Sequence, residues 1–137
     1  YMAKEELFHQ NVFFTLLIKA FGAFPVTRGK GDTQVIDTSI EKLEKGRNLV
    51  IFPEGTRSKD GKVGKGKTGV ALVAAVAQVP VVPVGINFEA KLKFRKRVVV
   101  RFGKPIVPGE IGVTATDPHS LRTIKNEIMK NIMELVH

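Results

Sequence analysis

Four consecutive apolar residues, Leu49-Val50-Ile51-Phe52, followed directly by Pro53, constrain the fold of this chain more than any other feature. A short continuous apolar run is typical of a strand that is buried on both faces, as in a parallel sheet covered by helices. Proline has no backbone N–H, so the strand is expected to end at Pro53. The run therefore predicts a sheet with helices packed on its faces.

Helical and strand patterns alternate along the rest of the chain. The expected elements are, in chain order, a helix over 11–21, a strand over 24–27, a helix from 32 or 33 to about 45, a strand over 49–52, a helix over 68–78, strands over 81–86 and 97–102, and a helix over 118–136. This alternation predicts the α/β class, with a mostly parallel sheet flanked by helices. A length of 137 residues suits a single domain.

The charge balance indicates which partners the chain attracts. It carries 22 Lys and Arg against 13 Asp and Glu, a formal net charge of +9, which favours phosphates, anionic lipid surfaces or nucleic acid. There is no cysteine, and the histidines His9, His119 and His137 are too scattered for a metal motif, so no metal site is expected. No apolar run reaches the ~20 residues of a membrane-spanning helix, so any membrane contact is expected to be peripheral.

The segment after Pro53 has the composition of a binding site. Residues 54–58, Glu-Gly-Thr-Arg-Ser, bring a carboxylate, a flexible turn, two hydroxyls and a guanidinium to the end of the predicted strand. Arg57 suits bidentate recognition of phosphate, and Glu54 could hold Arg57 in place or accept a hydrogen bond from a substrate hydroxyl. Strand-end loops are commonly polar, so an ordinary surface turn with one Glu–Arg pair explains the same residues.

Residues 52–58, Phe-Pro-Glu-Gly-Thr-Arg-Ser, resemble the third signature block of the glycerophospholipid acyltransferases, typified by 1-acyl-glycerol-3-phosphate O-acyltransferase. Residues 22–28, Gly-Ala-Phe-Pro-Val-Thr-Arg, resemble the second block, and residues 82–84, Val-Pro-Val, resemble the fourth. Residues 67–69, Lys-Thr-Gly, are similar to the Lys-x-Gly that opens the helix after the third block. The resemblance covers the chain from about residue 2 to residue 105.

The resemblance implies an acceptor site and an acyl-chain channel. Arg28 and Arg57 would bind the acceptor phosphate, because two guanidinium groups offset its charge with a fixed fork geometry. The implied phosphate- and glycerol-binding residues are Arg28, Glu54, Gly55, Thr56, Arg57, Ser58 and Lys67, and the implied channel residues are Val82, Pro83 and Val84. A solvated loop cation remains the alternative for Arg28, and a plain core strand remains the alternative for the channel residues.

The reaction that the resemblance implies is phospholipid biosynthesis. A fatty acyl group passes from a thioester, on coenzyme A or acyl carrier protein, to the free hydroxyl of a lysophosphatidate-like acceptor. No metal or bound cofactor is implied. The expected partners are the acceptor, the thioester and an anionic membrane surface at its cytoplasmic face, with peripheral attachment and no nucleic acid.

The first block of the family, His-x4-Asp, is absent from this sequence. The fifth residue after His9 is Phe14, and the fifth after His119 is Ile124. In the family this block supplies the base that acts on the acceptor hydroxyl, and it lies upstream of the segment found here from residue 2. Residues 1–137 are therefore interpreted as the C-terminal portion of an acyltransferase domain, without catalytic residues of their own and inactive alone.

Two further hypotheses come from other segments. Residues 61–68 satisfy the P-loop pattern Gly-x4-Gly-Lys-Thr ahead of a helix, but residues 54–60 separate them from the strand, and no strand ends in an Mg²⁺-holding Asp. Residues 91–104 are strongly basic and contain no acidic residue. They could dock a non-catalytic module on anionic lipid or nucleic acid, although only Phe94 and Phe102 are available for base stacking.

Overall fold

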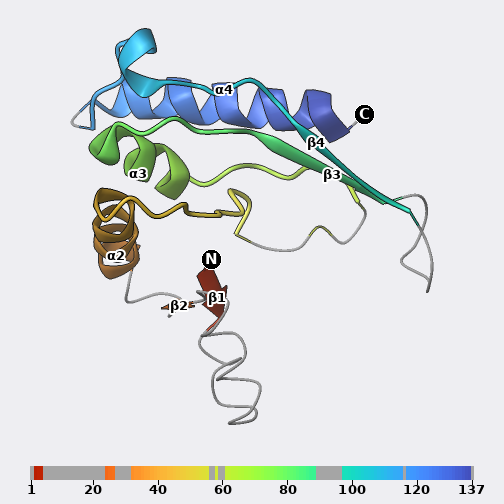
Figure 1. The fold of residues 1–137 in the computed structure, drawn as a ribbon. Helices are drawn as coiled ribbons and strands as arrows, with labels where there is room; N and C mark the ends of the chain where they lie inside the picture. Colours follow the sequence, from red (N-terminus) through yellow and green to blue (C-terminus); the bar gives the residue numbers. More distant parts are fainter. Residues whose placement is uncertain are drawn as a thin grey trace, which may run out of the picture. The chain divides into compact units, whose positions relative to one another are not determined.

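The computed structural model describes residues 2–4, 24–26, 32–55, 58, 61–88, 97–115 and 117–136. The elements, drawn in Figure 1, are β1 Met2–Lys4, β2 Phe24–Val26, α2 Asp32–Glu44, α3 Gly69–Ala77, β3 Val84–Phe88, β4 Val98–Phe102, a 3₁₀ helix Pro108–Ile111 and α4 Pro118–Val136. The chain divides into two compact units, Tyr1–Ile51 and Phe52–His137. The expected helix over 11–21 lies outside the described residues.

The first unit contains a parallel strand pair and helix α2. β1 and β2 pair in parallel, with Met2 opposite Phe24. The expected helix from 32 or 33 to about 45 is confirmed as α2, which ends at Glu44 and is followed by Gly46 with a φ of +72°. Gly46 N donates to Leu43 O at 2.9 Å and Arg47 N donates to Lys42 O at 3.1 Å, the two hydrogen bonds of a Schellman C-cap.

The prediction of a buried strand over residues 49–52 is wrong for the described structure. Residues 47–52 form no strand, and Val50 and Phe52 are 56% and 64% exposed. A strand of this kind is buried by neighbours that pair with it in a sheet, and no described segment pairs with these residues. An apolar run shows that a segment is suited to burial. Burial also requires neighbouring strands, and the described residues contain none that pair with this segment.

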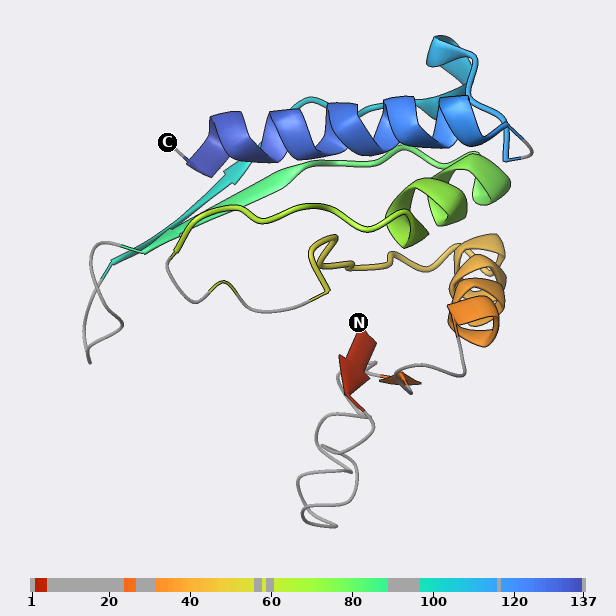
Figure 2. The same cartoon turned by 180° about the vertical axis from the view of Figure 1, so that it is seen from behind.

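The second unit is built around α4. Figures 1 and 2, taken from opposite sides, show α4 running along one side of the β3–β4 hairpin, with α3 next to it. The core lies where α3 and α4 meet and is made of small alanines from α3, isoleucines from α4 and one valine ahead of α4. These buried residues are Ala71, Ala74, Ala75, Val113, Ile124 and Ile128. The predicted helices over 68–78 and 118–136 are both confirmed.

The hairpin is antiparallel, in contrast to the predicted mostly parallel sheet. Ile86 lies opposite Val100 in the register, and the described residues contain this one antiparallel pair of strands and the parallel pair β1–β2. The connection over residues 89–97 is shorter than the crossover of about a dozen residues that parallel strands need. The predicted strand over 81–86 is shifted: Val81 makes only an isolated bridge with Ile106, and β3 starts after Pro83, which has no N–H to donate.

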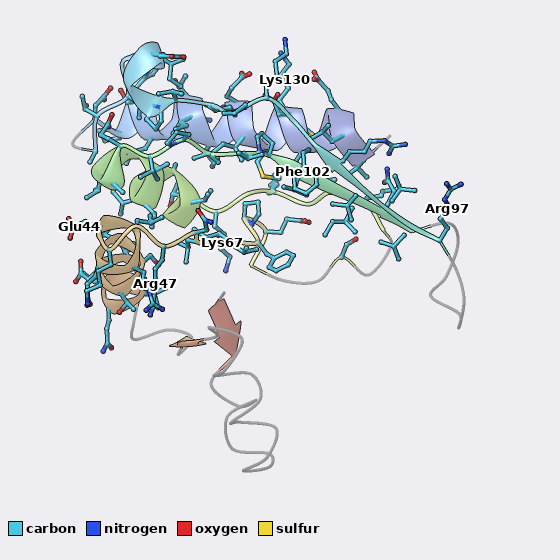
Figure 3. The ribbon with its side chains drawn as sticks, viewed as in Figure 1. Glu44, Arg47, Lys67, Arg97, Phe102 and Lys130 are labelled. Carbon is cyan, nitrogen blue, oxygen red and sulfur yellow. The ribbon has the colours of Figure 1, made fainter. Side chains whose placement is uncertain are left out.

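The two faces of the hairpin differ. Gly85 faces α4 so closely that a Cβ there would lie 2.6 Å from Leu135 Cβ. Asn87 Nδ2 and Arg101 Nη1 donate to Leu135 O at 3.3 and 3.2 Å, so this carbonyl in the last turn of α4 is hydrogen bonded. On the opposite face Phe102, labelled in Figure 3, is 72% exposed.

The start of α4 is capped by Asp117. Its Oδ1 accepts from His119 N at 3.0 Å, and its Oδ2 accepts from Ser120 N at 3.0 Å and from Ser120 Oγ at 2.7 Å. Pro118 occupies the first helical position, where no N–H is needed. The hydrogen bond from the Ser120 hydroxyl, followed by those from the two backbone amides, lowers the pKa of the Asp117 carboxyl.

Candidate functional site

The residues that follow the apolar run form a tight turn. Gly55 N donates to Phe52 O at 3.0 Å, which closes a four-residue turn over Phe52–Gly55. Pro53 takes the second position, for which its fixed φ is suited, and Gly55 has φ of +68°, a conformation that favours glycine. The turn leaves Glu54 half-buried and holds the backbone of the signature segment in one shape up to residue 55.

A second segment, the loop over residues 61–67, returns to this turn. Glu54 Oε2 accepts a hydrogen bond from Gly64 N at 2.6 Å, and Pro53 O accepts one from Lys67 N at 2.8 Å. The first is short, as expected when the acceptor is a carboxylate. The turn and the loop are therefore joined by one side-chain and one backbone hydrogen bond.

The Lys67 side chain lies across the turn. A Cβ built on Gly55 would be 3.0 Å from Lys67 Cε, 3.1 Å from its Nζ and 3.2 Å from its Cδ, so a side chain at position 55 would push the flexible end of the lysine out of this position. Figure 3 shows Lys67 beside the turn, and its side chain is exposed. Among the described residues no carboxylate forms an ion pair with Lys67.

The other side of the loop is held by α4. A Cβ on Gly66 would lie 2.6 Å from both Cγ and Sδ of Met129, which is itself buried. Gly66 therefore allows the loop backbone to lie directly against the helix. The loop is fixed between the turn on one side and α4 on the other.

Of the residues predicted from the sequence, the structure brings Glu54, Gly55 and Lys67 together. Arg28, Thr56 and Arg57 lie outside the described residues, and Ser58 is exposed. The predicted channel residues lie at the entry to β3: Val82 is exposed, Pro83 is buried and accepts from Gly103 N at 2.8 Å through its carbonyl, and Val84 pairs with Phe102.

Sequence reasoning missed two partners of the site. Gly64 and Met129 contact it through a backbone amide and a helix side chain, neither of which the signature segment indicates. The glycines at 61, 64 and 66 were the available signal, since closely spaced glycines often mark close backbone contacts. Their spacing also fits a P-loop, but two amides that a phosphate cradle would need, those of Gly64 and Lys67, already donate to protein acceptors.

The described part of the chain offers neither a metal-binding cluster nor a membrane-spanning helix. It holds no group of three or more His, Cys, Asp or Glu side chains suited to a metal ion. None of its helices combines the length and the apolar character needed to cross a membrane.

Comparison with known proteins identifies the family. Residues 1–87, more than half of the chain, match the family model described as Acyltransferase. The chain is 34% identical over 107 residues to the 1-acyl-sn-glycerol-3-phosphate acyltransferase of Bacillus subtilis (strain 168), covering 77% of this chain and 53% of that protein. It is 40% identical over 73 residues to the chloroplastic enzyme BAT2 of the same name from Brassica napus, covering 52% and 21%. The chain belongs to the acyltransferase family.

A solved structure supports this assignment at the level of the fold. The crystal structure of the 1-acyl-sn-glycerophosphate (LPA) acyltransferase PlsC from Thermotoga maritima superposes with a TM-score of 0.68 at 27% identity, covering 97% of this chain and 54% of that one. The predicted resemblance is thereby confirmed. The chain spans about half the length of this protein and of the Bacillus subtilis relative.

Proposed function

We propose that this chain provides the acceptor-binding portion of an acyltransferase that moves a fatty acyl group from a thioester to the free hydroxyl of a lysophosphatidate-like molecule. The observation that carries the proposal is the Phe52–Gly55 turn with the exposed Lys67 side chain beside it. A Cβ built on Gly55 would lie 3.1 Å from the Lys67 ammonium nitrogen. Thr56 and Arg57 follow this turn directly in the sequence. Relatives that carry the name 1-acyl-sn-glycerol-3-phosphate acyltransferase agree with it.

The chemistry of the site suits a phosphomonoester. Such a group carries a charge of about −1.5 to −2 at neutral pH and accepts several hydrogen bonds. Residues 52–68 contain five cationic side chains against two carboxylates, and one of those carboxylates, Glu54, already accepts from Gly64 N. Arg28 and Arg57 would add guanidinium forks that match phosphate oxygens.

We assign no proton transfer to this chain. Its 137 residues contain no His-x4-Asp block, so the residues described above can bind and orient an acceptor without activating its hydroxyl. The expected thioester, on coenzyme A or acyl carrier protein, is a co-substrate rather than a resident cofactor. The chain alone is expected to bind acceptor without acylating it.

Peripheral attachment to an anionic membrane surface completes the proposal. Arg97 and Lys104 flank β4, both are exposed, and Arg97 stands at the distal end of the strand in Figure 3. Each basic residue close to an anionic bilayer contributes about 1 kcal/mol of attraction. We place this surface at the cytoplasmic face, where anionic lipids are concentrated.

The test is equilibrium binding of a short-chain lysophosphatidate, kept below its micelle concentration, measured by titration calorimetry. Arg57→Ala should weaken binding about 10- to 100-fold, because it removes charge-assisted hydrogen bonds. Arg122→Ala, the same change at an exposed position of α4, is the matched control and should change affinity less than about twofold. Equal affinities for the two variants would contradict the proposal. Salt-sensitive binding to anionic vesicles that ignores Arg57→Ala would favour a non-catalytic docking module instead.

A further inference from the structure

We propose that Glu54 is a positioning residue, which holds the loop over residues 61–67 against the turn and thereby places the Lys67 ammonium as a phosphate ligand. This inference rests on the proposed function. It assigns Glu54 a task different from direct contact with the acceptor hydroxyl. The difference can be measured, because a residue that acts through Lys67 has no effect once Lys67 is gone.

The first argument is the hydrogen bond that Glu54 already makes. Its Oε2 lies 2.6 Å from Gly64 N, the shorter of the two hydrogen bonds that join the turn to the loop. A carboxylate oxygen bonded to a backbone amide is held in direction by that amide. Glu54 is also half-buried, which limits the freedom of its side chain to reach a ligand.

The second argument is the way in which the loop is fastened. Gly64 is bonded to Glu54, Gly66 lies against Met129 of α4, and Lys67 N is bonded to Pro53 O at 2.8 Å. These three contacts within residues 64–67 restrict the conformation of the loop backbone. The Glu54 attachment is the one made by a side chain outside the core, so it can be removed without opening the core.

The third argument concerns Lys67 itself. A lysine side chain carries its ammonium group on a flexible four-carbon chain. Fixing its direction costs conformational entropy, and this cost is smaller when the backbone of the residue is already held. Here its backbone N–H is bonded to the turn and its Cδ, Cε and Nζ lie against Gly55. A lysine held in this way presents its positive charge beside Gly55, the residue that precedes Thr56 in the sequence.

A double-mutant cycle tests the coupling. Lysophosphatidate affinity is measured for the wild-type chain, Glu54→Ala, Lys67→Ala and the double variant. We expect a loss of about tenfold for Lys67→Ala, the size of one charge-assisted hydrogen bond, and about fivefold for Glu54→Ala. The double variant should bind no more weakly than Lys67→Ala. Lys130→Ala, an equal loss of charge at an exposed position of α4, is the control and should change affinity less than about twofold.

A second variant keeps the test decisive if Glu54→Ala fails to fold. Gly64→Ala adds a methyl group that would lie 2.9 Å from Glu54 Oε2, so it displaces the flexible end of that side chain and leaves the core alone. It should reproduce the loss seen in Glu54→Ala, and its effect should also vanish in the Lys67→Ala background. Far-UV circular dichroism checks that each variant is folded.

The outcomes separate this inference from the proposed function. Losses that multiply in the double variant would overturn the inference, because they mean that Glu54 meets the acceptor independently of Lys67. The same conclusion follows if Gly64→Ala binds as the wild type does. If the wild-type chain itself does not bind lysophosphatidate, the proposed function fails and the inference falls with it.

Discussion

The two parts of the second unit are held together by different forces. α3, α4 and the β3–β4 hairpin meet through buried apolar side chains and close backbone packing, as at Gly85. The turn over residues 52–55 and the loop over 61–67 are joined mainly by two hydrogen bonds near the surface. Buried side chains contribute about 1.5–3 kcal/mol each, whereas one hydrogen bond contributes a net of about 0.5–1.5 kcal/mol. We call α3, α4 and the hairpin the packed part, and the turn with the loop the tied part. The free energy of unfolding should therefore depend mainly on the packed part, and acceptor binding on the tied part.

The largest effect on the free energy of unfolding is expected from truncating a buried side chain of the packed part. Ile124 is fully buried at the α3–α4 contact, so Ile124→Ala should lower the free energy of unfolding by about 3 kcal/mol, from lost burial and a residual cavity. Urea denaturation followed by circular dichroism measures this. Ile111→Ala, at a residue 46% exposed, is the control and should cost less than about 1 kcal/mol. Similar costs at the two positions would mean that the core is not where the structure places it.

Overpacking should act in the same direction. A methyl group at Gly85 would meet the backbone of Leu135, with its C at 2.8 Å and O at 2.9 Å, so Gly85→Ala requires α4 to move. We expect a loss of about 2 kcal/mol in the same denaturation experiment. Gly69→Ala adds the same group where nothing lies within 4 Å, at the start of α3, and should be neutral or slightly stabilising. A stable Gly85→Ala protein would contradict the close contact.

A smaller effect, with a pH signature, is expected at the start of α4. Because hydrogen bonds lower the pKa of Asp117, the charged carboxylate stabilises the fold above its ordinary value of 3.8. This contribution should disappear as the pH falls through the lowered value in the folded state. Asp117→Ala should reduce the melting temperature by about 4 °C at pH 7.

Asp117→Asn is the matched control for that prediction, since it keeps an acceptor oxygen and cannot ionise. The difference in melting temperature between the wild type and Asp117→Asn should be largest above the ordinary pKa of 3.8 and should shrink as the pH falls through the lowered pKa of the folded state. A difference that stays constant over this range would show that ionisation of Asp117 does not support the helix.

The smallest effect on stability is expected in the tied part. Glu54→Ala should lower the free energy of unfolding by about 0.5 kcal/mol, because the bond to Gly64 joins groups near the surface. The same variant should lose acceptor affinity, as described above. A destabilisation as large as that of Ile124→Ala would remove the distinction between the two parts.

Local patterns in the sequence predicted most of the helices. α2 and α4 follow from apolar residues at helical spacing, and Gly46 lies just beyond the end of α2. The run over 49–52 misled because its burial depends on strands that must come from elsewhere in a sheet. β3 starts later than predicted because Pro83 interrupts the apolar run and has no N–H to donate to a neighbouring strand.

The sequence indicated the turn and the family, whereas the roles of the predicted site residues stay predictions and the connections between them were not indicated. The segment 52–58 marked the turn and gave its family. The bond between Glu54 and Gly64, however, depends on the path of a loop whose sequence fits a P-loop equally well. The contact of Gly66 with Met129 joins positions far apart in the chain, and no local pattern reports it.

That last contact links the choice of residue at two distant positions. A side chain at 66 requires the Met129 side chain to move or to be replaced by a smaller one, because the loop backbone at Gly66 lies against that side chain. When sequences of the family are compared, changes at these two positions should therefore appear together. If the loop were transferred to another protein, that protein would likewise need a helix that leaves space for the loop backbone. A transferable form of this site therefore includes the part of α4 around Met129.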